Sequence, residues 1–459
     1  MAARTLACSI ALVATLLATC AQAVPKTWVG ADGGSFGTSA NWNPAGAPGP
    51  SDSALFANGT VASTYDINFD ANATLTQLTV ATSPLVFTGP SRTLSLTSTS
   101  GSPTSLLIGR NGSGTASATL TSNLAQLNAV YAMLGADTGS SGTLNLVAGA
   151  LSVSGTGTFT DFAIGNWGTG TVNVSSGADV SVTGETWLAV YGGSTGNLSI
   201  TGTGSTWTNT GILRTGKGSG TINVSSGATL SAAGGIELFH GRITGNGDIN
   251  AAVNSRGGII APNSLTSGYG TLHITGPLTQ DTSSKIEIQL GGTTAGTFDR
   301  LNITGAATLA GTLQVTLPSF APSLPQNTVL DILDFTSVTG TFATVTLPGL
   351  TGSLEWDTSK LYTDGTIRVV LPGDFNNNGT VDAADYTLWQ KGRGTIYTTA
   401  DYNTWRTHFG KSAAGTGSSL DATTSIPEPA ALILALLALC SWPLRGRPST
   451  PDPPRVIPA

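Results

Sequence analysis

The sequence predicts an all-β chain, a right-handed parallel β-helix or solenoid, followed by a small helical module. Three observations carry this prediction. Short apolar segments recur between glycine-rich turns, only 10% of the residues are charged while Gly accounts for 60 of 459, and one segment near the C-terminal end has aromatic residues at helical spacing. Disordered chains are charge-rich and poor in β-branched residues, so this composition favours many short strands joined by glycine turns.

Residues 1–23 are predicted to be a signal peptide. Arg4 supplies the positive start, the run from Leu6 to Leu17 is mostly apolar, and Ala21-Gln22-Ala23 forms a cleavage site of the A-x-A type. Lipoprotein processing at Cys20 is the alternative. Both alternatives predict that the chain is exported.

Charge and cysteine content exclude two classes of protein. The net charge is −6 and there is no basic patch, so nucleic-acid binding lacks its electrostatic basis. Cys8 and Cys20 lie in the signal peptide, and Cys440 lies in a terminal apolar segment. The exported region therefore has no disulfide framework, and its stability must come from stacked repeats and backbone hydrogen bonds.

A repeated unit occupies much of residues 24–370. It reads apolar-x-apolar-Gly, a short glycine-rich spacer, then Gly-Thr-apolar-x-apolar. The glycines that open its second half recur at nearly regular intervals, at Gly114, Gly142, Gly170, Gly196 and Gly220. Such a period indicates a solenoid whose repeats share one core, and by analogy with other folds of this period a right-handed parallel β-helix. A β-sandwich or a series of meanders is the alternative.

Alternation within a repeat predicts which side chains face inward. Val172, Val174, Val180 and Val182 should be buried, whereas Asn173 and Ser181 should face outward. Residues 24–60, which include Trp28 and Trp42, are expected to form an opening cap. Residues 255–370 continue in β-structure with a looser period.

The repeats resemble the autotransporter-type passenger repeats of exported bacterial proteins. The resemblance rests on the run Gly-Thr-Val-Asn-Val-Ser-Ser-Gly-Ala at 170–178, its near copy at 220–228, and the stretch Phe-Asp-Arg-Leu-Asn-Ile-Thr-Gly at 298–305. These motifs are low in complexity. The resemblance therefore implies the fold more than a function.

A calcium-binding loop is predicted at residues 374–385. Oxygen ligands fall at loop positions 1, 3, 5, 9 and 12, and position 7 offers a backbone carbonyl; the six residues are Asp374, Asn376, Asn378, Thr380, Asp382 and Asp385. Gly379 stands where the loop turns sharply, and Val381 can anchor it to a core. This is the EF-hand ligand order, with Asp instead of Glu at position 12. The alternative is a surface turn rich in Asn and Gly.

Two short helices are expected to follow this loop. Ala-Asp-Tyr-x-x-Trp occurs at 384–389 and again at 400–405. The spacing puts each Tyr and Trp on one helix face, so the two aromatic pairs can pack together. The second copy lacks a ligand loop, since Gln390, Gly392 and Gly394 occupy its positions 1, 3 and 5.

Residues 371–412 resemble a type I dockerin domain, in the variant common among planctomycete-type bacteria. The resemblance implies two EF-hand-like loop-helix units that bind a cohesin-like protein through their helices. It also implies Ca²⁺ as the bound ion, with the six loop residues as its ligands. Loss of the second loop departs from the two-calcium pattern of the family.

The C-terminal end is predicted to be a sorting segment. Residues 413–426 form a polar linker, 427–447 carry Pro427-Glu428-Pro429, an apolar run and a basic end, and 448–459 are rich in Pro. This order resembles a PEP-CTERM sorting signal. The resemblance implies a membrane segment at 430–444, cleavage by an exosortase-type enzyme, and transfer to the cell surface or extracellular matrix. A simple membrane anchor is the alternative.

No catalytic residue is predicted. Polysaccharide lyases and hydrolases of this shape need carboxylates clustered with basic groups. The densest polar group on the repeats, best explained by capping or solvation, is Glu237, His240, Arg242 and Asp248; three further acidic residues lack a matched base, namely Asp161, Asp179 and Glu185. Trp167, Trp187 and Trp207 recur at equal intervals, as a sugar-stacking strip or, more simply, as flank packing.

The sequence thus predicts an exported, non-enzymatic structural or adhesion protein with a calcium-stabilised docking module. The alternative is a β-helix that binds or degrades a polysaccharide, brought to it by the same module. In the first case a cohesin-like protein is the expected partner, and in the second a surface polysaccharide.

Overall fold

A computed structural model describes residues 25–57, 64–98, 104–110, 116–155, 160–263, 268–318 and 323–413. The predicted signal peptide, sorting segment and Pro-rich tail lie outside these residues, as does all but the first residue of the predicted linker. The chain divides into two compact units. The first extends to Val370, without Gly352–Leu354, and the second comprises those three residues and the chain from Leu371 onward.

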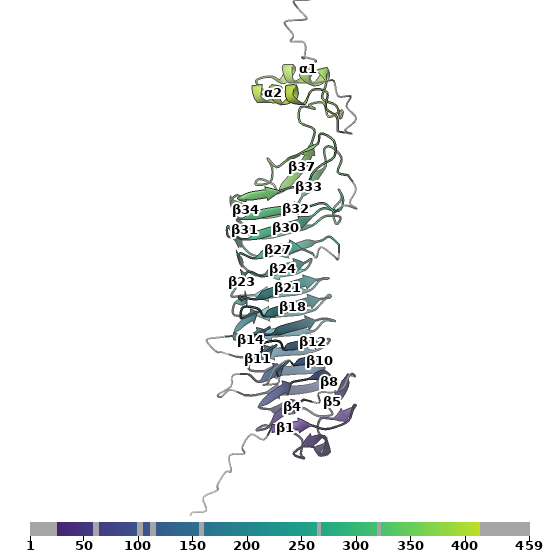
Figure 1. Cartoon of the computed structure of the whole chain (residues 1–459), viewed down its shortest axis with the longest axis vertical. Coiled ribbons are helices and arrows are strands. Elements are labelled where there is room, and N and C mark those ends of the chain that lie inside the picture. The colour runs from purple at the N-terminus through teal and green to yellow at the C-terminus, as the bar shows by residue number, and fades with distance from the viewer. Residues whose placement is uncertain are drawn as a thin grey trace, which may run out of the picture. The chain divides into compact units, whose positions relative to one another are not determined.

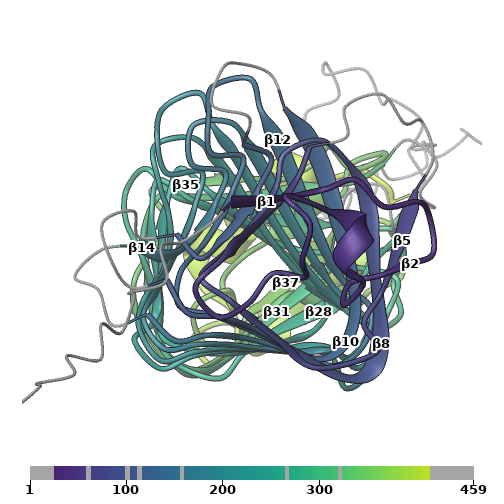
Figure 2. The ribbon, with the colours of Figure 1, turned by 90° about the horizontal axis from the view of Figure 1, so that it is seen from below.

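The first unit is built from β-strands, so the all-β prediction is confirmed. Thirty-four strands of the described residues form one hydrogen-bonded sheet, in which almost every pairing is parallel. A strand typically pairs with the third strand further along the chain, for example β12 with β15 and β15 with β18. The pairings therefore form three ladders (Figures 1 and 2).

The first ladder begins at the N-terminal end of the described chain. Its strands are β1 (Pro25–Trp28), β4 (Ser53–Phe56), β7 (Gln77–Val80), β9 (Leu106–Ile108), β11 (Ala132–Leu134), β14 (Thr160–Ile164), β17 (Glu185–Leu188), β20 (Leu213–Thr215), β23 (Ile236–Phe239), β26 (Val253–Arg256) and β29 (Leu278–Gln280). It continues through the second halves of β31 (Arg300–Leu309) and β34 (Leu333–Gly340).

The second ladder contains the following strands. They are β2 (Gly34–Ser35), β5 (Tyr65–Asn68), the first halves of β8 (Ser83–Leu96) and β10 (Ser117–Ala129), then β12 (Ser141–Leu146), β15 (Thr169–Val174), β18 (Thr195–Thr201), β21 (Ser219–Ser225), β24 (Arg242–Gly245), β27 (Ile259–Pro262), β30 (Lys285–Gln289), β32 (Thr312–Thr316) and β35 (Thr344–Thr346).

The third ladder starts at β6 (Ala73–Leu75) and passes through the second halves of β8 and β10. Its later strands are β13 (Ala150–Val153), β16 (Asp179–Val182), β19 (Thr206–Asn209), β22 (Thr229–Ala232), β25 (Asp248–Asn250), β28 (Thr271–Ile274) and the first halves of β31 and β34. One strand from each ladder makes up one repeat.

The core of the first unit consists of apolar side chains stacked in register. In the second ladder, Leu144, Val172, Leu198 and Ile222 stand directly opposite one another and are at most 1% exposed. The predicted inward residues Val172, Val174, Val180 and Val182 are all buried, and Asn173 and Ser181 face outward. Burial of each such side chain contributes about 1.5–3 kcal/mol to the free energy of folding. The side chain is buried only because the next repeat covers it.

The repeat glycines fill positions where two strands approach closely. Gly142, Gly170, Gly196 and Gly220 stand opposite one another, as their spacing suggests. Gly114 lies outside the described residues, and Ala118 is the residue opposite Gly142. The repeat frame read from the sequence is therefore wrong at its first unit, because Gly114-Thr115 matches the motif while the residues that pair with Gly142 and Thr143 are Ala118 and Thr119.

Aromatic packing closes the N-terminal end of the first unit. Trp28 and Trp42 are buried and meet edge to face, with ring centroids 5.1 Å apart. Trp42 lies on β3 (Trp42–Asn43), which pairs antiparallel with β1 after the short 3-10 helix η1 (Ser39–Asn41). The chain thus turns back on itself before the parallel ladders begin.

The C-terminal end of the first unit leaves the ladder pattern. β33 (Val329–Asp331), β36 (Glu355–Asp357) and β37 (Thr366–Val370) form a separate antiparallel sheet. Leu330 and Ile367 are opposite each other in this sheet and fully buried.

The second unit contains the two α-helices of the described residues, α1 (Ala383–Gly392) and α2 (Thr399–His408), where the Ala-Asp-Tyr-x-x-Trp motif predicts them. Each starts with a capping box, built by Asp382 with Asp385 in α1 and by Thr398 with Asp401 in α2. These reciprocal bonds satisfy amides that a helix start leaves unpaired.

Candidate functional site

The predicted calcium loop folds as a tight turn held by its own side chains. Gly379 has φ +86°, the left-handed conformation that the sharp turn requires. Asp374 Oδ2 accepts a hydrogen bond from the Gly379 amide at 2.8 Å, and its Oδ1 accepts one from the Asn378 amide at 3.1 Å. Asn376 Oδ1 accepts from the Asn378 amide, and Asn378 Oδ1 accepts from the Thr380 amide.

Asp385 connects the end of this loop to its beginning. It is fully buried; its Oδ1 accepts from the Phe375 and Asn376 amides at 2.8 and 3.1 Å, and its Oδ2 accepts from the Asp382 amide at 2.8 Å. Asp382 Oδ1 in turn accepts from the Ala384 amide at 2.7 Å. The last two ligand positions therefore also cap α1.

The loop is anchored from both sides, as the sequence predicts for Val381. This side chain is fully buried, and its amide donates to the Lys411 carbonyl at 2.9 Å. The Trp405 indole of α2 donates to the Asp382 carbonyl at 2.8 Å, and the Trp389 indole of α1 donates to the Thr398 carbonyl at 2.7 Å. Each helix thus holds the segment that precedes the other.

The donor set fits a hard cation. The side chains at the ligand positions offer only oxygen, and Asp374 and Asp385 are almost completely buried in one twelve-residue loop. Burial of two carboxylates is costly without compensation, which here comes from backbone amides and would be increased by a bound cation. Among the described residues no group of three His, Cys, Asp or Glu side chains is arranged to hold a metal. The predicted shell contains three carboxylates, Asp374, Asp382 and Asp385, and this structure does not gather them into such a group.

The second motif has no loop of this type. Gln390 and Gly392 belong to α1, so two of the three corresponding positions are helical. The aromatic residues of both motifs nonetheless pack together: Tyr386 lies 5.1 Å from Trp405, and Trp389 lies 4.9 Å from Tyr402, between ring centroids. The predicted aromatic core is confirmed.

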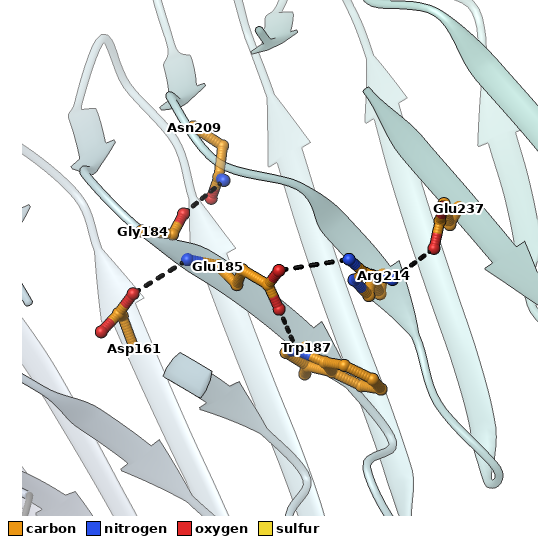
Figure 3. Close-up of polar contacts among 7 residues, drawn as sticks. All are labelled: Asp161, Gly184, Glu185, Trp187, Asn209, Arg214 and Glu237. Atoms are coloured by element: carbon orange, nitrogen blue, oxygen red, sulfur yellow. Dashed lines mark hydrogen bonds and ion pairs between the residues drawn. The ribbon is translucent and has the colours of Figure 1, made fainter. Parts of the chain in front are cut away.

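A charged cluster on the first ladder joins three successive repeats. It consists of Glu185, Trp187, Arg214 and Glu237, and we call it the Arg214 cluster (Figure 3). The Arg214 guanidinium contacts Glu185 Oε1 through Nη2 at 3.1 Å and Glu237 Oε2 through Nη1 at 2.5 Å. It also lies 5.4 Å from the ring centroid of Trp187, whose indole donates to Glu185 Oε2 at 2.9 Å.

This geometry is that of a cross-strand brace. Trp187, Arg214 and Glu237 are direct neighbours across β17, β20 and β23. Both carboxylates are bound to one guanidinium, so neither is presented as an isolated acid or base. Arg242 with Glu287 and Arg300 with Asp331 and Asp334 repeat the same pairing elsewhere in the first unit.

The structure does not bring together the polar groups singled out in the sequence. Glu237, Arg242 and Asp248 lie on β23, β24 and β25, which belong to three different ladders. Asp161 is fully buried and accepts from the Glu185 amide at 2.9 Å, and Asp179 accepts from the Thr206 hydroxyl. These two carboxylates therefore stabilise the repeats through hydrogen bonds to neighbouring strands.

The three evenly spaced tryptophans do not form a strip. Trp207 is buried against Phe162, and Trp187 belongs to the Arg214 cluster. Trp167 stacks instead on Tyr191, a residue that sequence reasoning did not single out. The missed signal was the repeat period, because Tyr191 occupies in its repeat the place that Trp167 occupies in the one before.

Comparison with protein-family models and with curated proteins finds no match to this chain. In the described part of the chain no helix is long and apolar enough to cross a membrane, and the predicted segment at 430–444 lies outside that part.

Proposed function

We propose that this chain is an exported, non-enzymatic structural or adhesion protein of the cell surface or extracellular matrix. The observation that carries the proposal is the ion pairing between repeats: Arg214 bridges β17 and β23, Arg242 on β24 contacts Glu287 on β30, and Arg300 on β31 contacts Asp334 on β34. Charges arranged in this way stabilise a stack of repeats, and the carboxylates of these pairs are bound to arginine instead of being presented as a matched acid and base.

The proposal includes a finer description of the fold. With three strands per repeat and parallel pairing to the third strand along, we infer that the ladders close into a right-handed parallel β-helix. The support is the register, which advances by one repeat at each step through β12, β15, β18 and β21 without a break. Right-handed connections between parallel strands are strongly preferred because strands twist to the right.

The second unit is proposed to be a calcium-stabilised docking module of the dockerin type. Asp374, Asn376, Asn378, Asp382 and Asp385 would hold the ion with the Thr380 carbonyl. The ion would supply charge compensation to the two buried carboxylates and stability to the fold. A cohesin-like protein is the proposed partner of the helices.

Export and sorting complete the proposal. The signal peptide at 1–23 would direct secretion, and an exosortase-type enzyme would recognise Pro427-Glu428-Pro429 after membrane insertion of 430–444. Mass spectrometry of the mature protein tests this: a C-terminus near Pro429 supports sorting, and an intact C-terminus contradicts it.

A calcium titration of the full-length chain tests the module. Asp374→Ala should weaken calcium binding by at least about tenfold, since it removes the first ligand and the turn that it holds. Asp385 and Asp401 provide a matched pair, because each is the third residue of its helix and closes a capping box there. Asp385→Asn should lose calcium affinity, and Asp401→Asn should not. Equal affinity in these two variants would refute the ligand assignment.

Polysaccharide binding is the second candidate function. Its support is the stacked pair Trp167 and Tyr191, which are 47% and 40% exposed and have no role in the core. The paired carboxylates favour binding over degradation. A lyase and hydrolase assay separates the two, since turnover that depends on Glu237 would contradict the non-enzymatic proposal.

A further inference from the structure

One part of the second ladder presents an uncharged polar surface. Between the first half of β10 and β21, the outward side chains fall in three rows across five strands. The rows are Ser117, Ser141, Thr169, Thr195, Ser219; then Thr119, Thr143, Thr171, Asn197, Thr221; then Thr121, Asn145, Asn173, Ser199, Asn223. None of these residues is buried, and every side chain carries a hydroxyl or an amide. We call this surface the hydroxyl face.

The hydroxyl face has clear limits. On β8, Pro84 and Val86 stand opposite Thr119 and Thr121, and on β24 the residue opposite Thr221 is Arg242. The other two ladders carry charges over the same repeats, namely Glu185 and Arg214 on the first and Asp179 on the third. The uncharged surface is therefore local to these five strands.

The middle row of the face is open to a ligand. The third row bonds within itself: Asn145 Nδ2 donates to Thr121 Oγ1 at 3.1 Å, and Asn173 Nδ2 donates to Asn145 Oδ1 at 2.8 Å. Among the described residues, no side chain of the middle row has a hydrogen-bond partner. Strand spacing places its members about 4.8 Å apart, and the rows lie about 6.6 Å apart. The middle row is therefore a regular array of donors and acceptors without partners, and it lies beside the third row, whose side chains are held by their own hydrogen bonds.

The stacked pair Trp167 and Tyr191 stands at the edge of this face. The turn that carries Trp167 leads directly into β15, and the turn that carries Tyr191 leads into β18. The Tyr191 amide donates to the Asn166 carbonyl at 3.2 Å, which brings the two turns together. The rings are parallel within 8°, with centroids 3.8 Å apart, and slightly less than half of each residue's surface is exposed. Large exposed aromatic surface of this kind marks interaction sites.

We propose that the hydroxyl face and the Trp167–Tyr191 pair together form a binding surface for a neutral polysaccharide. A glycan without charge has hydroxyls that match the rows and apolar C–H faces that match the rings. A nucleic acid or an acidic glycan would require a cluster of cations, and the face has none. A protein partner would require an apolar centre, whereas here the centre is polar. The inference rests on polysaccharide binding as the second proposed function.

Two aspartate substitutions test the face under matched conditions. Thr171 lies in its middle row on β15, and Thr208 is an outward, exposed Thr on β19 of the third ladder. Both are flanked by polar, uncharged neighbours on adjacent strands. Thr171→Asp should reduce retention of the full-length chain on a neutral polysaccharide by at least about tenfold. The reason is that an uncompensated charge would lose its water when the glycan binds. Thr208→Asp should be retained like the parent.

Retention is measured by affinity electrophoresis and pull-down on cellulose, β-xylan, β-mannan and agarose, with alginate and polygalacturonate as anionic comparisons. We expect retention by at least one neutral polymer, little changed in about 0.5 M NaCl. The double variant Trp167→Ala/Tyr191→Ala should lose it, while its far-UV circular dichroism matches the parent. Retention only on the anionic polymers, retention on none, or equal retention of Thr171→Asp and Thr208→Asp would overturn the inference. None of these outcomes bears on the calcium titration, so the proposal of a structural or adhesion protein with a calcium-stabilised module is judged separately.

Discussion

At the scale of single residues, burial decides what a polar group does in this chain. Asp299 is only 3% exposed, and its carboxylate accepts from the Gly270 and Gln289 amides at 3.2 and 3.0 Å. Burial raises the pKa of Asp299 from 3.8 to about 7, against the opposing effect of these two hydrogen bonds. The residue was part of a repeat motif in the sequence, and nothing in that motif distinguished it from an exposed Asp.

The raised pKa of Asp299 predicts that stability depends on pH. Between pH 3.8 and about 7 the unfolded chain loses this proton while the folded chain keeps it. The free energy of unfolding should therefore fall as pH rises through this window, by at most about 1.4 kcal/mol per pH unit, and level off above it. Urea midpoints measured across the window check this contribution.

Variants isolate this contribution from that of other groups. Asp299→Asn should lose the downward trend, because the amide does not titrate. Asp70→Asn, at an exposed carboxylate, should keep it. Parallel pH profiles for the parent and Asp299→Asn would contradict the assignment.

At the scale of elements, close approach between strands explains where glycine is required. A Cβ on Gly196 would lie 2.3 Å from the Ile164 carbonyl oxygen and 2.4 Å from the Ala189 amide nitrogen, both backbone atoms that cannot move away easily. Gly192 belongs to the preceding turn, has no positive φ, and has open space where its Cβ would be. Two glycines so close in the chain thus have different physical roles.

Alanine substitution should separate these roles. Gly196→Ala should reduce the free energy of unfolding by about 1–3 kcal/mol through overpacking. Gly192→Ala should be neutral or slightly stabilising, because it only restricts the unfolded chain. Chemical denaturation measures both, and similar midpoints for the two variants would show that the strand relaxes around the added methyl group.

The helices show which contacts a local sequence pattern can predict and which it cannot. Tyr and Trp at i and i+3 were enough to predict α1, α2 and their aromatic contacts, since side chains at this spacing share one helix face. The same reasoning could not predict that Trp405 donates to the Asp382 carbonyl, because that contact depends on how two helices cross.

At the scale of the whole molecule, each unit has a core of its own. The core of the first unit is made of stacked ladder residues such as Val172 and Leu198, and that of the second is built around Val381, Trp389 and Trp405. We therefore expect a chain that ends at Val370 to keep the β-sheet circular dichroism signal of the first unit and its urea midpoint.

A second truncation provides the control for this prediction. A chain that ends at Asp364 also lacks β37, which pairs with both β33 and β36. It should have a lower urea midpoint, since Ile367 and Val369 leave the core of the small sheet. Loss of the β-sheet signal in the chain that ends at Val370 would show that the first unit requires the second.

The sequence by itself determined the features that depend on residues close together in the chain. These are the all-β class, the inward and outward alternation, the turn at Gly379, the buried anchor Val381 and both helices. Period and composition are local properties of the chain, so they can be read without knowing the fold.

Only the tertiary structure decided which residues meet across repeats. Register brought Arg214 between Glu185 and Glu237, placed Tyr191 on Trp167, and separated Glu237, Arg242 and Asp248 onto three ladders. It also aligned the three rows of the hydroxyl face. The physical reason is that the repeats differ in length, as the unequal steps between the paired glycines Gly142, Gly170, Gly196 and Gly220 show. A small change in the length of a turn therefore changes every contact between neighbouring strands.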